Sequence, residues 1–291
     1  MRIRTMLAAL MAICGAGVFL AAAPASAFDS ASFQTIYRHY DGSVGSPAGG
    51  FATCPTGTKA VSAGGSNAVL SDLTLSLDGL SAYSIGTPIG AGAPYTVVQA
   101  TCVPAGQVSH ATLVHVAIPA APGNIFRANL SCPPGTSAFG GGGYFTAADG
   151  SLSPGARLYA DAPTADGRSW LFRAKGLSAS QIVHATVRCV PPVAPPLGHF
   201  YSVVTVSKNV AFSASGTSGT AVCPTGAKPV SGGAWWTTSS GAIDELASLT
   251  SSESIHGPDA WQGVGVGHNG DTLHVIARCA NTMTVVVIGH L

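Results

Sequence analysis

The chain has 291 residues, of which 9% are charged, with 13 Lys and Arg against 12 Asp and Glu. A soluble domain usually carries about a quarter of charged residues, so much of this surface must consist of Ser, Thr, Gly and backbone groups. No basic run is present to neutralise phosphates, which argues against a nucleic-acid partner, and no polybasic or amphipathic segment favours a membrane surface.

The first 27 residues have the composition of an export signal. Arg2 and Arg4 precede an apolar run over residues 6–20, and an Ala-Ser-Ala cleavage site follows at residues 25–27. The apolar run is short for a membrane span. We therefore expect a secreted protein whose mature chain begins at Phe28 and has no membrane span.

Short β-branched runs with alternating polarity recur along the mature chain, and no segment of a dozen residues there has a clean helical period. Four such runs stand out: Gln34–Tyr40, Thr112–Ile118, Tyr201–Ser207 and Met283–Ile288. The pattern predicts an all-β protein. The last run is expected to return to the first and pair near it, because this would hide an exposed sheet edge.

Each of the first three runs is followed by a Cys-Pro-x-Gly motif. The copies read CPTGTKAVSAGG from Cys54, CPPGTSAFGGGG from Cys132 and CPTGAKPVSGGA from Cys223. Proline followed two residues later by glycine is typical of a tight turn. A further glycine follows ten residues after each cysteine, at Gly64, Gly142 and Gly233. Glycine within a strand pattern indicates a bulge or the close approach of another backbone.

Each motif is followed, later in its repeat, by a strand that ends in a second cysteine. Removal of the leader leaves six cysteines in the mature chain. An even number of cysteines in an exported chain favours disulfides. The repeat selects one pairing: Cys54–Cys102, Cys132–Cys189 and Cys223–Cys279. No CxxC or Cys/His pair has the spacing of a metal site, so we predict no metal ligands and no cofactor.

The remaining parts of each repeat are less regular. An aromatic residue precedes the second cysteine by 18 or 19 positions, at Tyr83, Trp170 and Trp261. The stretches 149–169 and 239–260, rich in Gly, Ser, Asp and Pro, are interpreted as loops or ragged strands. The mature chain, 28–291, is thus predicted to be one all-β domain of three repeats, at about 31–105, 106–193 and 194–291.

These features resemble two groups of proteins. The Cys-Pro-x-Gly copies with a glycine pair and a closing cysteine look like repeats of exported actinobacterial proteins of unassigned activity. More distantly, SVVTVSK, AVCPTG and GDTLHVIARC in the third repeat resemble the repeat of vitelline membrane outer layer proteins. The second resemblance implies a closed three-sided β-prism with one disulfide in each repeat. It supplies no catalytic residues, and the family's Asp-Asp-Thr-type signature survives only as Asp271-Thr272.

Histidine and arginine occupy equivalent places in the last strands of two repeats. His184 and Arg188, and likewise His274 and Arg278, lie five residues and one residue before the second cysteine, on the face opposite it. They are either a polar site or a solvated strand face, and the second interpretation is favoured because the first repeat has other residues there. His268 with Asp271 suggests a metal site, but a hairpin turn through the intervening Asn-Gly explains the pattern better.

No sequence motif of a known catalytic mechanism is present, so no catalytic residue is assigned. Asp149, Asp161 and Asp166 could supply the carboxylate pair of a glycoside hydrolase. Aspartates in such loops more often stabilise turns. The sequence therefore favours a secreted binding or coat module over its alternative, a secreted glycoside-type hydrolase with an unrecognised site.

Trp235 and Trp236 follow the third glycine pair, where the second repeat has Tyr144. Adjacent residues of a strand point to opposite faces, so one tryptophan is expected in the core. The other is expected either to face solvent or to lie beneath the loop that follows. An exposed indole is a natural stacking surface for a sugar ring. Trp235, Trp236 and Tyr144 are therefore the candidate glycan-binding residues, and an extracellular glycan or cell-surface component is the expected partner.

Overall fold

The computed structural model describes residues 33–89, 94–120, 125–153, 155–175, 178, 180–191, 201–255, 257 and 259–282. These residues form eighteen strands and one short 3-10 helix, so the all-β prediction is confirmed. The first repeat contains β1 (Gln34–Asp41), β2 (Ala48–Thr53), β3 (Thr58–Ser66), β4 (Ala68–Leu75), β5 (Ser81–Pro88), β6 (Tyr95–Pro104) and η2 (Ala105–Val108). The second contains β7 (Thr112–Pro119), β8 (Phe126–Ser131), β9 (Ser137–Ala147), β10 (Arg157–Pro163), β11 (Ser169–Lys175) and β12 (Gln181–Val190). The third contains β13 (Tyr201–Ala211), β14 (Thr217–Val222), β15 (Lys228–Thr237), β16 (Ser248–Ile255), β17 (Ala260–Val266) and β18 (Thr272–Thr282).

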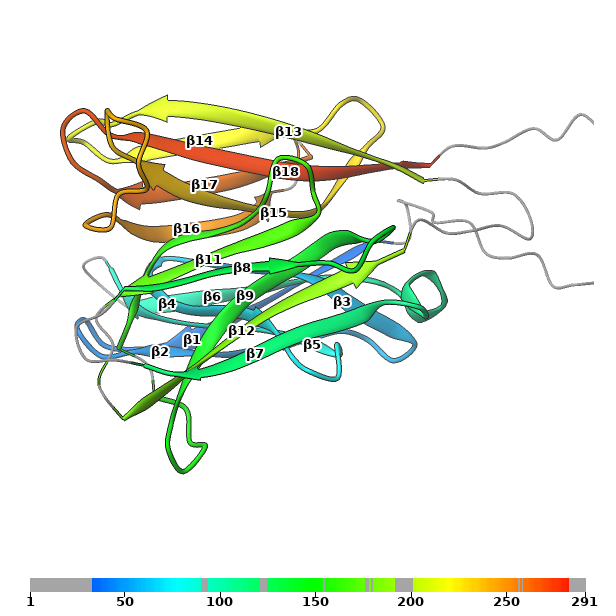
Figure 1. Cartoon of the computed structure of the whole chain (residues 1–291), viewed down its shortest axis with the longest axis horizontal. Helices are drawn as coiled ribbons and strands as arrows, with labels where there is room; N and C mark the ends of the chain where they lie inside the picture. The colour runs from blue at the N-terminus through cyan, green and yellow to red at the C-terminus, as the bar shows by residue number, and fades with distance from the viewer. Residues whose placement is uncertain are drawn as a thin grey trace, which may run out of the picture.

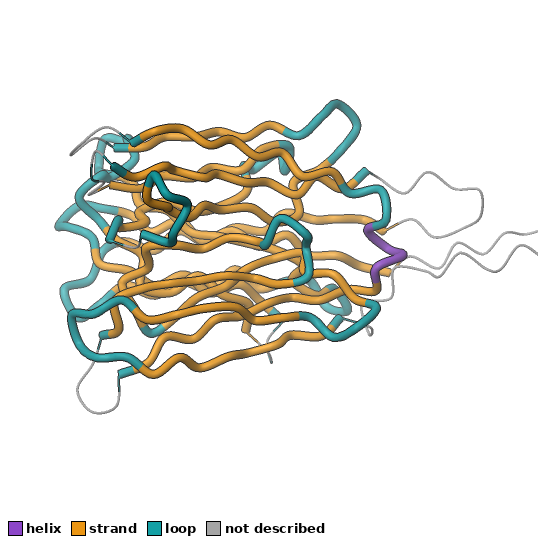
Figure 2. Tube along the Cα trace, turned by 90° about the horizontal axis from the view of Figure 1, so that it is seen from below, coloured by secondary structure: helices purple, strands orange, loops and turns teal. Residues whose placement is uncertain are grey.

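The strands form three six-stranded sheets, and each sheet combines strands of two repeats (Figure 1). Sheet A has the order β1-β6-β3-β16-β17-β14, sheet B the order β2-β5-β4-β9-β12-β7, and sheet C the order β13-β18-β15-β10-β11-β8. Each repeat thus gives its first, third and sixth strands to one sheet and the other three to a second. The strands run roughly along the long axis, with η2 at one end (Figure 2).

Two repeats meet within each sheet at a very short junction, and in sheets B and C a glycine makes that junction possible. Between β4 and β9 the pairing is confined to Leu73 with Gly143. A Cβ atom on the neighbouring Gly142 would collide with the carbonyl oxygen of Leu73, and one on Gly233 would collide with that of Asp161. The predicted close approach of another backbone at these glycines is therefore confirmed.

Each third strand also contains a β-bulge, and the three bulged residues occupy equivalent positions. The strand register shifts at Val61, Phe139 and Val230. These three side chains are buried in one small cluster together with Val103, Val108, Val190 and Ala280. Because all three repeats contribute to the cluster, burying it stabilises their association near η2.

The disulfides follow the predicted pairing, and each one connects two different sheets. Cys54 follows β2 of sheet B and is bonded to Cys102 of β6 in sheet A. The same relation joins sheets C and B through Cys132–Cys189, and sheets A and C through Cys223–Cys279. The bridged cysteines are 48, 57 and 56 residues apart in the sequence. All three pairs of sheets are thus covalently tied.

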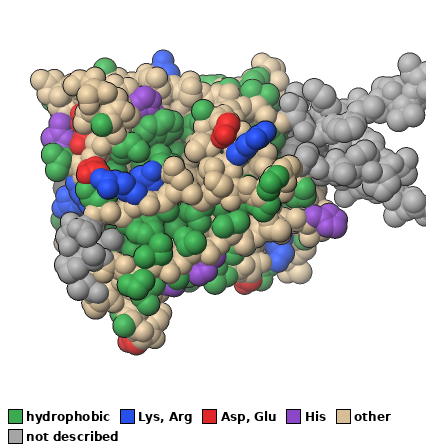
Figure 3. Space-filling model, in the orientation of Figure 1, with side chains coloured by type: hydrophobic (Ala, Val, Ile, Leu, Met, Phe, Trp, Pro, Cys, Tyr) green, Lys and Arg blue, Asp and Glu red, His purple; other side chains and the backbone are tan. Residues whose placement is uncertain are grey.

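Each sheet ends in two edge strands, and no strand pairing among the described residues joins one sheet to another. The sheets are therefore not closed by hydrogen-bonded strands. The main core nevertheless contains side chains of all three repeats, including Leu73, Phe145, Phe172, Trp236 and Trp261. Charged side chains are sparse on the face shown in Figure 3, where hydrophobic and other uncharged groups cover most of the surface. No helix among the described residues is long and apolar enough to span a membrane.

The structure differs from the sequence predictions in two places. Each opening strand is followed by a second strand, β2, β8 or β14, which the sequence did not predict. The other difference concerns Tyr83: strand pairing aligns Trp170 and Trp261 with Ala82, because Ala82 pairs with Ala52 where Trp170 pairs with Leu130. The stretches 149–169 and 239–260, interpreted as loops or ragged strands, contain β10 and β16, and the pairing register of each of these strands shifts once.

The alignment of Tyr83 is wrong by one residue because counting back from the cysteine ignores hairpins of different length. Its neighbour Ala82 belongs to the main core, whereas Tyr83 packs against Phe51 with ring centroids 4.8 Å apart.

Two further predictions, the export signal in residues 1–27 and the pairing of the run at 283–288 with the first strand, lie outside the described residues.

Candidate functional site

The two adjacent tryptophans of β15 lie on opposite faces of sheet C. Trp236 has no exposed surface and belongs to the main core. Trp235 is partly exposed and stacks on His274 of β18, with ring centroids 4.9 Å apart and an interplanar angle of 7°. The histidine is held at both ring nitrogens, by the hydroxyl of Thr237 at 2.8 Å and the amide oxygen of Asn209 at 2.9 Å. The expected division of the pair into one core and one outward tryptophan is thus found.

The second repeat builds the same arrangement on sheet B. Tyr144 of β9 stacks on His184 of β12 with centroids 4.4 Å apart and an interplanar angle of 6°. The Nε2 atom of His184 lies 2.9 Å from the hydroxyl of Thr146. Its Nδ1 atom lies 3.1 Å from Nε2 of His115 on β7, whose ring is stacked in turn. An aromatic residue, a histidine and a threonine therefore recur at equivalent positions of two sheets.

Strand register places these rings together. His184 pairs directly with Tyr144, and His274 pairs directly with Trp235, so both members point to the same face. Partial burial lowers the pKa of His274, and burial together with the neighbouring His115 lowers the pKa of His184. Burial thus disfavours the charged form of both imidazoles, and in the neutral form each stack is a flat, uncharged surface.

The first repeat lacks this arrangement because it has small or aliphatic residues at the same places. Ser66 and Val97 pair where the other repeats have the aromatic residue and the histidine. Ser66 instead donates a hydrogen bond to the carboxylate of Glu253 at 3.0 Å. Sheet A therefore presents a polar contact between repeats where sheets B and C present rings.

The arginines that the sequence grouped with these histidines do not join the stacks. Arg188 and Arg278 are both buried. Each lies against the glycine of a hairpin in the preceding repeat, Arg188 at Gly79 and Arg278 at Gly167. Both glycines have positive φ, so the hairpin has no side chain there and leaves room for the guanidinium group. These arginines pack one repeat against another.

The three aspartates considered for hydrolysis have separate structural roles. Asp149 accepts hydrogen bonds from the hydroxyl and backbone N–H of Ser151, which lower its pKa. Asp166 accepts hydrogen bonds from the hydroxyl of Thr164 and the backbone N–H of Arg168 in its hairpin, and these bonds lower its pKa too. Asp161 lies in β10, not in a loop, and accepts a hydrogen bond from the indole of Trp170 at 2.6 Å. Burial raises the pKa of Asp161, whose carboxyl group is enclosed in the core.

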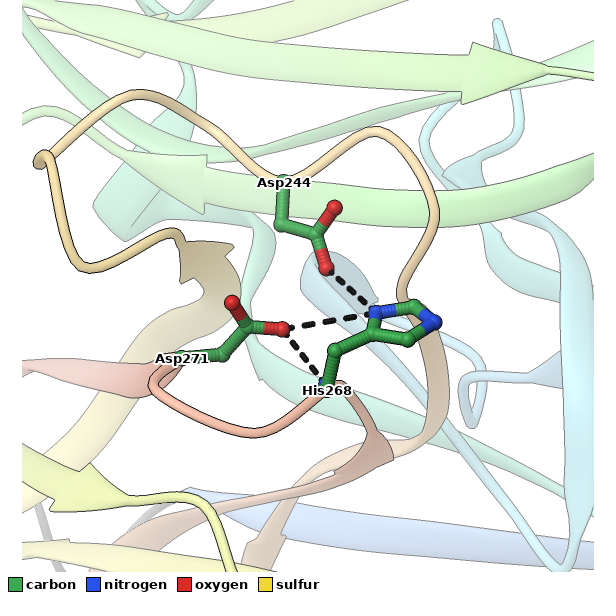
Figure 4. A group of neighbouring side chains, drawn as sticks. All are labelled: Asp244, His268 and Asp271. Carbon is green, nitrogen blue, oxygen red and sulfur yellow. Dashed lines mark hydrogen bonds and ion pairs between the residues drawn. The ribbon is translucent and has the colours of Figure 1, made fainter.

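A third group of side chains lies at the β17–β18 hairpin (Figure 4). The backbone N–H of His268 donates to the carboxylate of Asp271, and the N–H of Asp271 returns a bond to the carbonyl of His268. The predicted turn is thus present, with Gly270 at positive φ. The segment between β15 and β16 adds Asp244, whose Oδ2 atom lies 3.0 Å from Nδ1 of His268.

Sequence reasoning missed Asp244 because it lies 24 residues before His268, in a segment without a motif. Its carboxylate lies beside that of Asp271, and burial together with this neighbouring carboxylate raises the pKa of Asp271. Ligand atoms of all three side chains fall within 4.8 Å of one another.

No protein-family model matches this chain, and no curated protein matches it either.

Proposed function

We propose that this protein is a secreted binding or coat module that engages extracellular glycans through Trp235 and Tyr144. The observation that carries the proposal is the repeated stack of an outward aromatic ring on a hydrogen-bonded histidine, on two of the three sheets. Trp236, a candidate from the sequence, is assigned to the core and not to the binding surface.

The stacks have the physical properties of a carbohydrate platform. A sugar ring presents an apolar C–H face that packs against the face of an aromatic ring, while its hydroxyls remain available to polar groups. Trp235 and Tyr144 are each fixed by a neighbouring imidazole, so little side-chain entropy is lost when a ligand binds. Polar groups lie beside the rings, including Thr237 on sheet C and Thr146 on sheet B.

In this proposal the three sheets are the sides of a closed prism. The covalent tie between every pair of sheets supports closure. At the corner between β1 and β2, the hydroxyl of Tyr40 donates to the carbonyl of Phe51 at 2.7 Å and accepts from its N–H at 2.8 Å. A side chain thus satisfies the backbone where the strands part. The leader at residues 1–27 and the disulfides together support export.

The proposal is tested by applying the purified mature protein to a broad glycan array. The best-binding soluble oligosaccharide is then titrated while tryptophan fluorescence is followed. Trp235→Ala should abolish the fluorescence shift and weaken binding, and Tyr144→Ala should weaken binding at the second sheet. Val204→Ala, which removes an exposed apolar side chain elsewhere on sheet C, is the matched control and should bind normally. Binding that survives the combined Trp235→Ala and Tyr144→Ala change would refute the assignment.

A further inference from the structure

The group formed by Asp244, His268 and Asp271 has a counterpart in the second repeat that carries no charge. The segment after β15 returns to it through a bridge between Thr237 and Ile243, and the segment after β9 does so through Thr146 and Leu152. The residue after each bridge then donates its backbone N–H to a carbonyl oxygen of the strand it returns to. Asp244 donates to Trp236 of β15 at 3.0 Å, and Ser153 donates to Phe145 of β9 at 2.9 Å. Ser153 therefore occupies the place of Asp244.

Gln181 likewise occupies the place of Asp271, eight residues before the second cysteine of its repeat. Its amide oxygen accepts a hydrogen bond from the N–H of Ser178 at 2.8 Å, as the Asp271 carboxylate does from His268. Its amide nitrogen donates to the hydroxyl oxygen of Ser153 at 3.2 Å. A neutral pair therefore suffices to hold this turn, and the carboxylates and imidazole of the third repeat are not needed for it.

In the second repeat, the amide of Gln181 donates a hydrogen bond to Ser153. In the third repeat, the carboxylates of Asp271 and Asp244 stand at these two places, and an ionised carboxylate can only accept. The side chains of Asp244 and Asp271 are each 6% exposed, and both carboxylates face Nδ1 of His268, at 3.0 and 3.5 Å (Figure 4). Lys175 is close enough to interact electrostatically with Asp244, but its ammonium group donates to the backbone carbonyl of Glu245. Two adjacent carboxylates with one imidazole leave an excess of negative charge that a cation would neutralise.

We propose that these three side chains bind a divalent transition-metal ion, best matched by Zn²⁺, through Oδ2 of Asp244, Oδ2 of Asp271 and Nδ1 of His268. Zinc accepts carboxylate and imidazole ligands at about 2.0–2.2 Å, which places neighbouring ligand atoms about 3.0–3.5 Å apart in tetrahedral to octahedral arrangements. The two distances from Nδ1 already match that spacing. A nitrogen ligand and a set of three protein ligands favour zinc over calcium, which takes six to eight oxygen ligands.

The site is open on one side. The side chain of His268 is 54% exposed, whereas both aspartate side chains are almost enclosed. An ion held here would thus have protein ligands on its inner side and solvent at its remaining positions. Three protein ligands with an open position are also the arrangement that lets a bound ion take a further ligand. This inference is independent of the proposed glycan binding.

The test adds ZnCl₂, with no other ligand, to the mature protein. Calorimetry measures zinc binding, and thermal unfolding measures its effect on Tm. We expect one equivalent to bind and Tm to rise with the zinc concentration. Asp271→Gln and Asp244→Ser install the residues of the second repeat, so both variants should fold. Each should weaken zinc binding by more than about tenfold, since even a partner outside the ligand set is worth about that much. Ca²⁺ at equal concentration should shift Tm less than Zn²⁺ does.

Two control variants separate this site from other zinc binding. Asp149→Asn removes an exposed carboxylate from the matching hairpin, and His115→Ala breaks the pair of imidazoles on sheet B. Both should bind zinc as the unchanged protein does. Absence of zinc binding by the unchanged protein, unaltered binding by the Asp244→Ser/Asp271→Gln double variant, or loss through His115→Ala alone would overturn the proposal. Should the double variant not fold, the ring resonances of His268 in the unchanged protein decide, because direct ligation must shift them.

Discussion

Trp235 and Trp236 are consecutive residues of β15 whose side chains lie in opposite environments. Trp236 has no exposed surface and packs in the main core, where a Cβ atom on Gly265 or Gly267 would touch its ring. Trp235 lies on the outer face against His274. One step along a strand thus separates a residue that stabilises the fold from one that is available to a ligand.

Replacing each tryptophan by alanine should therefore have different effects on stability. Trp236→Ala should lower the free energy of unfolding by about 3–5 kcal/mol, because it removes a large buried side chain and leaves a cavity. Trp235→Ala should lower the free energy of unfolding by only about 1 kcal/mol, which is the contribution of an aromatic stack on a partly exposed face. Chemical denaturation followed by circular dichroism measures both. Equal costs for the two variants would contradict the assignment of Trp235 to the outer face.

The glycine at a junction between repeats should resist even the smallest side chain. Gly233→Ala would place a methyl group against the backbone of Asp161 and Ala162 on β10, which must move or lose its pairing with β15. We expect a loss of stability of at least about 1–3 kcal/mol, typical of an overpacked core. Gly106→Ala is the matched control, since a Cβ atom at that position would have no other atom within 4 Å. Thermal unfolding should show a large fall in Tm for the first variant and almost none for the second.

Each disulfide should contribute to stability by holding two sheets together. Changing Cys223 and Cys279 to serine removes the tie between sheets A and C. The expected loss is about 2–5 kcal/mol, since a loop of this length then regains its freedom in the unfolded chain. Urea denaturation of the double variant measures this loss. A variant as stable as the unchanged protein would show that the remaining contacts already fix these sheets.

The frame of the fold was predictable from the sequence because it is repeated. Three copies of one motif identified the disulfides and the glycines of the junctions, of which Gly142 and Gly233 lie against another backbone. The sharing of each sheet between two repeats was not predictable, since no local pattern states which chain segment pairs with which. The proposed zinc-binding group was hidden for the same reason: Asp244 reaches His268 only through the packing of two hairpins.

The stacking surface was predictable only in part. Alternation along β15 required one tryptophan to face outward, but the sequence did not say which one. The choice follows from the register with β18, where Trp235 pairs with His274 and Trp236 with Leu273. Leu273 belongs to the core, so Trp236 does as well. The prediction of a histidine on the same face became useful only when this pairing was known.

A buried carboxyl group in β4 should make the protein less stable as the pH rises. Burial raises the pKa of Asp72 from 3.8 to about 8, although its carboxylate accepts hydrogen bonds from the N–H of Phe145 at 3.0 Å and the hydroxyl of Ser71 at 3.3 Å. Between these two pKa values the folded protein binds a proton that the unfolded chain has lost. The free energy of unfolding therefore falls with rising pH across this range, by at most about 1.4 kcal/mol per pH unit for this group.

Asp72→Asn should reduce that dependence, and the remaining slope should include the contribution of Asp161, whose pKa burial also raises. The amide keeps the acceptor for Phe145 but carries no charge, so the variant should be more stable than the unchanged protein at pH 8–9 and closer to it at pH 5. Measurements from pH 7 upward avoid interference from His184 and His274, whose lowered pKa values act at lower pH. Asp149→Asn is the control: the pKa of Asp149 is lowered, so this group is ionised in both states above pH 7. An identical slope in the Asp72→Asn variant and in the unchanged protein would show that Asp72 is already ionised in the folded state.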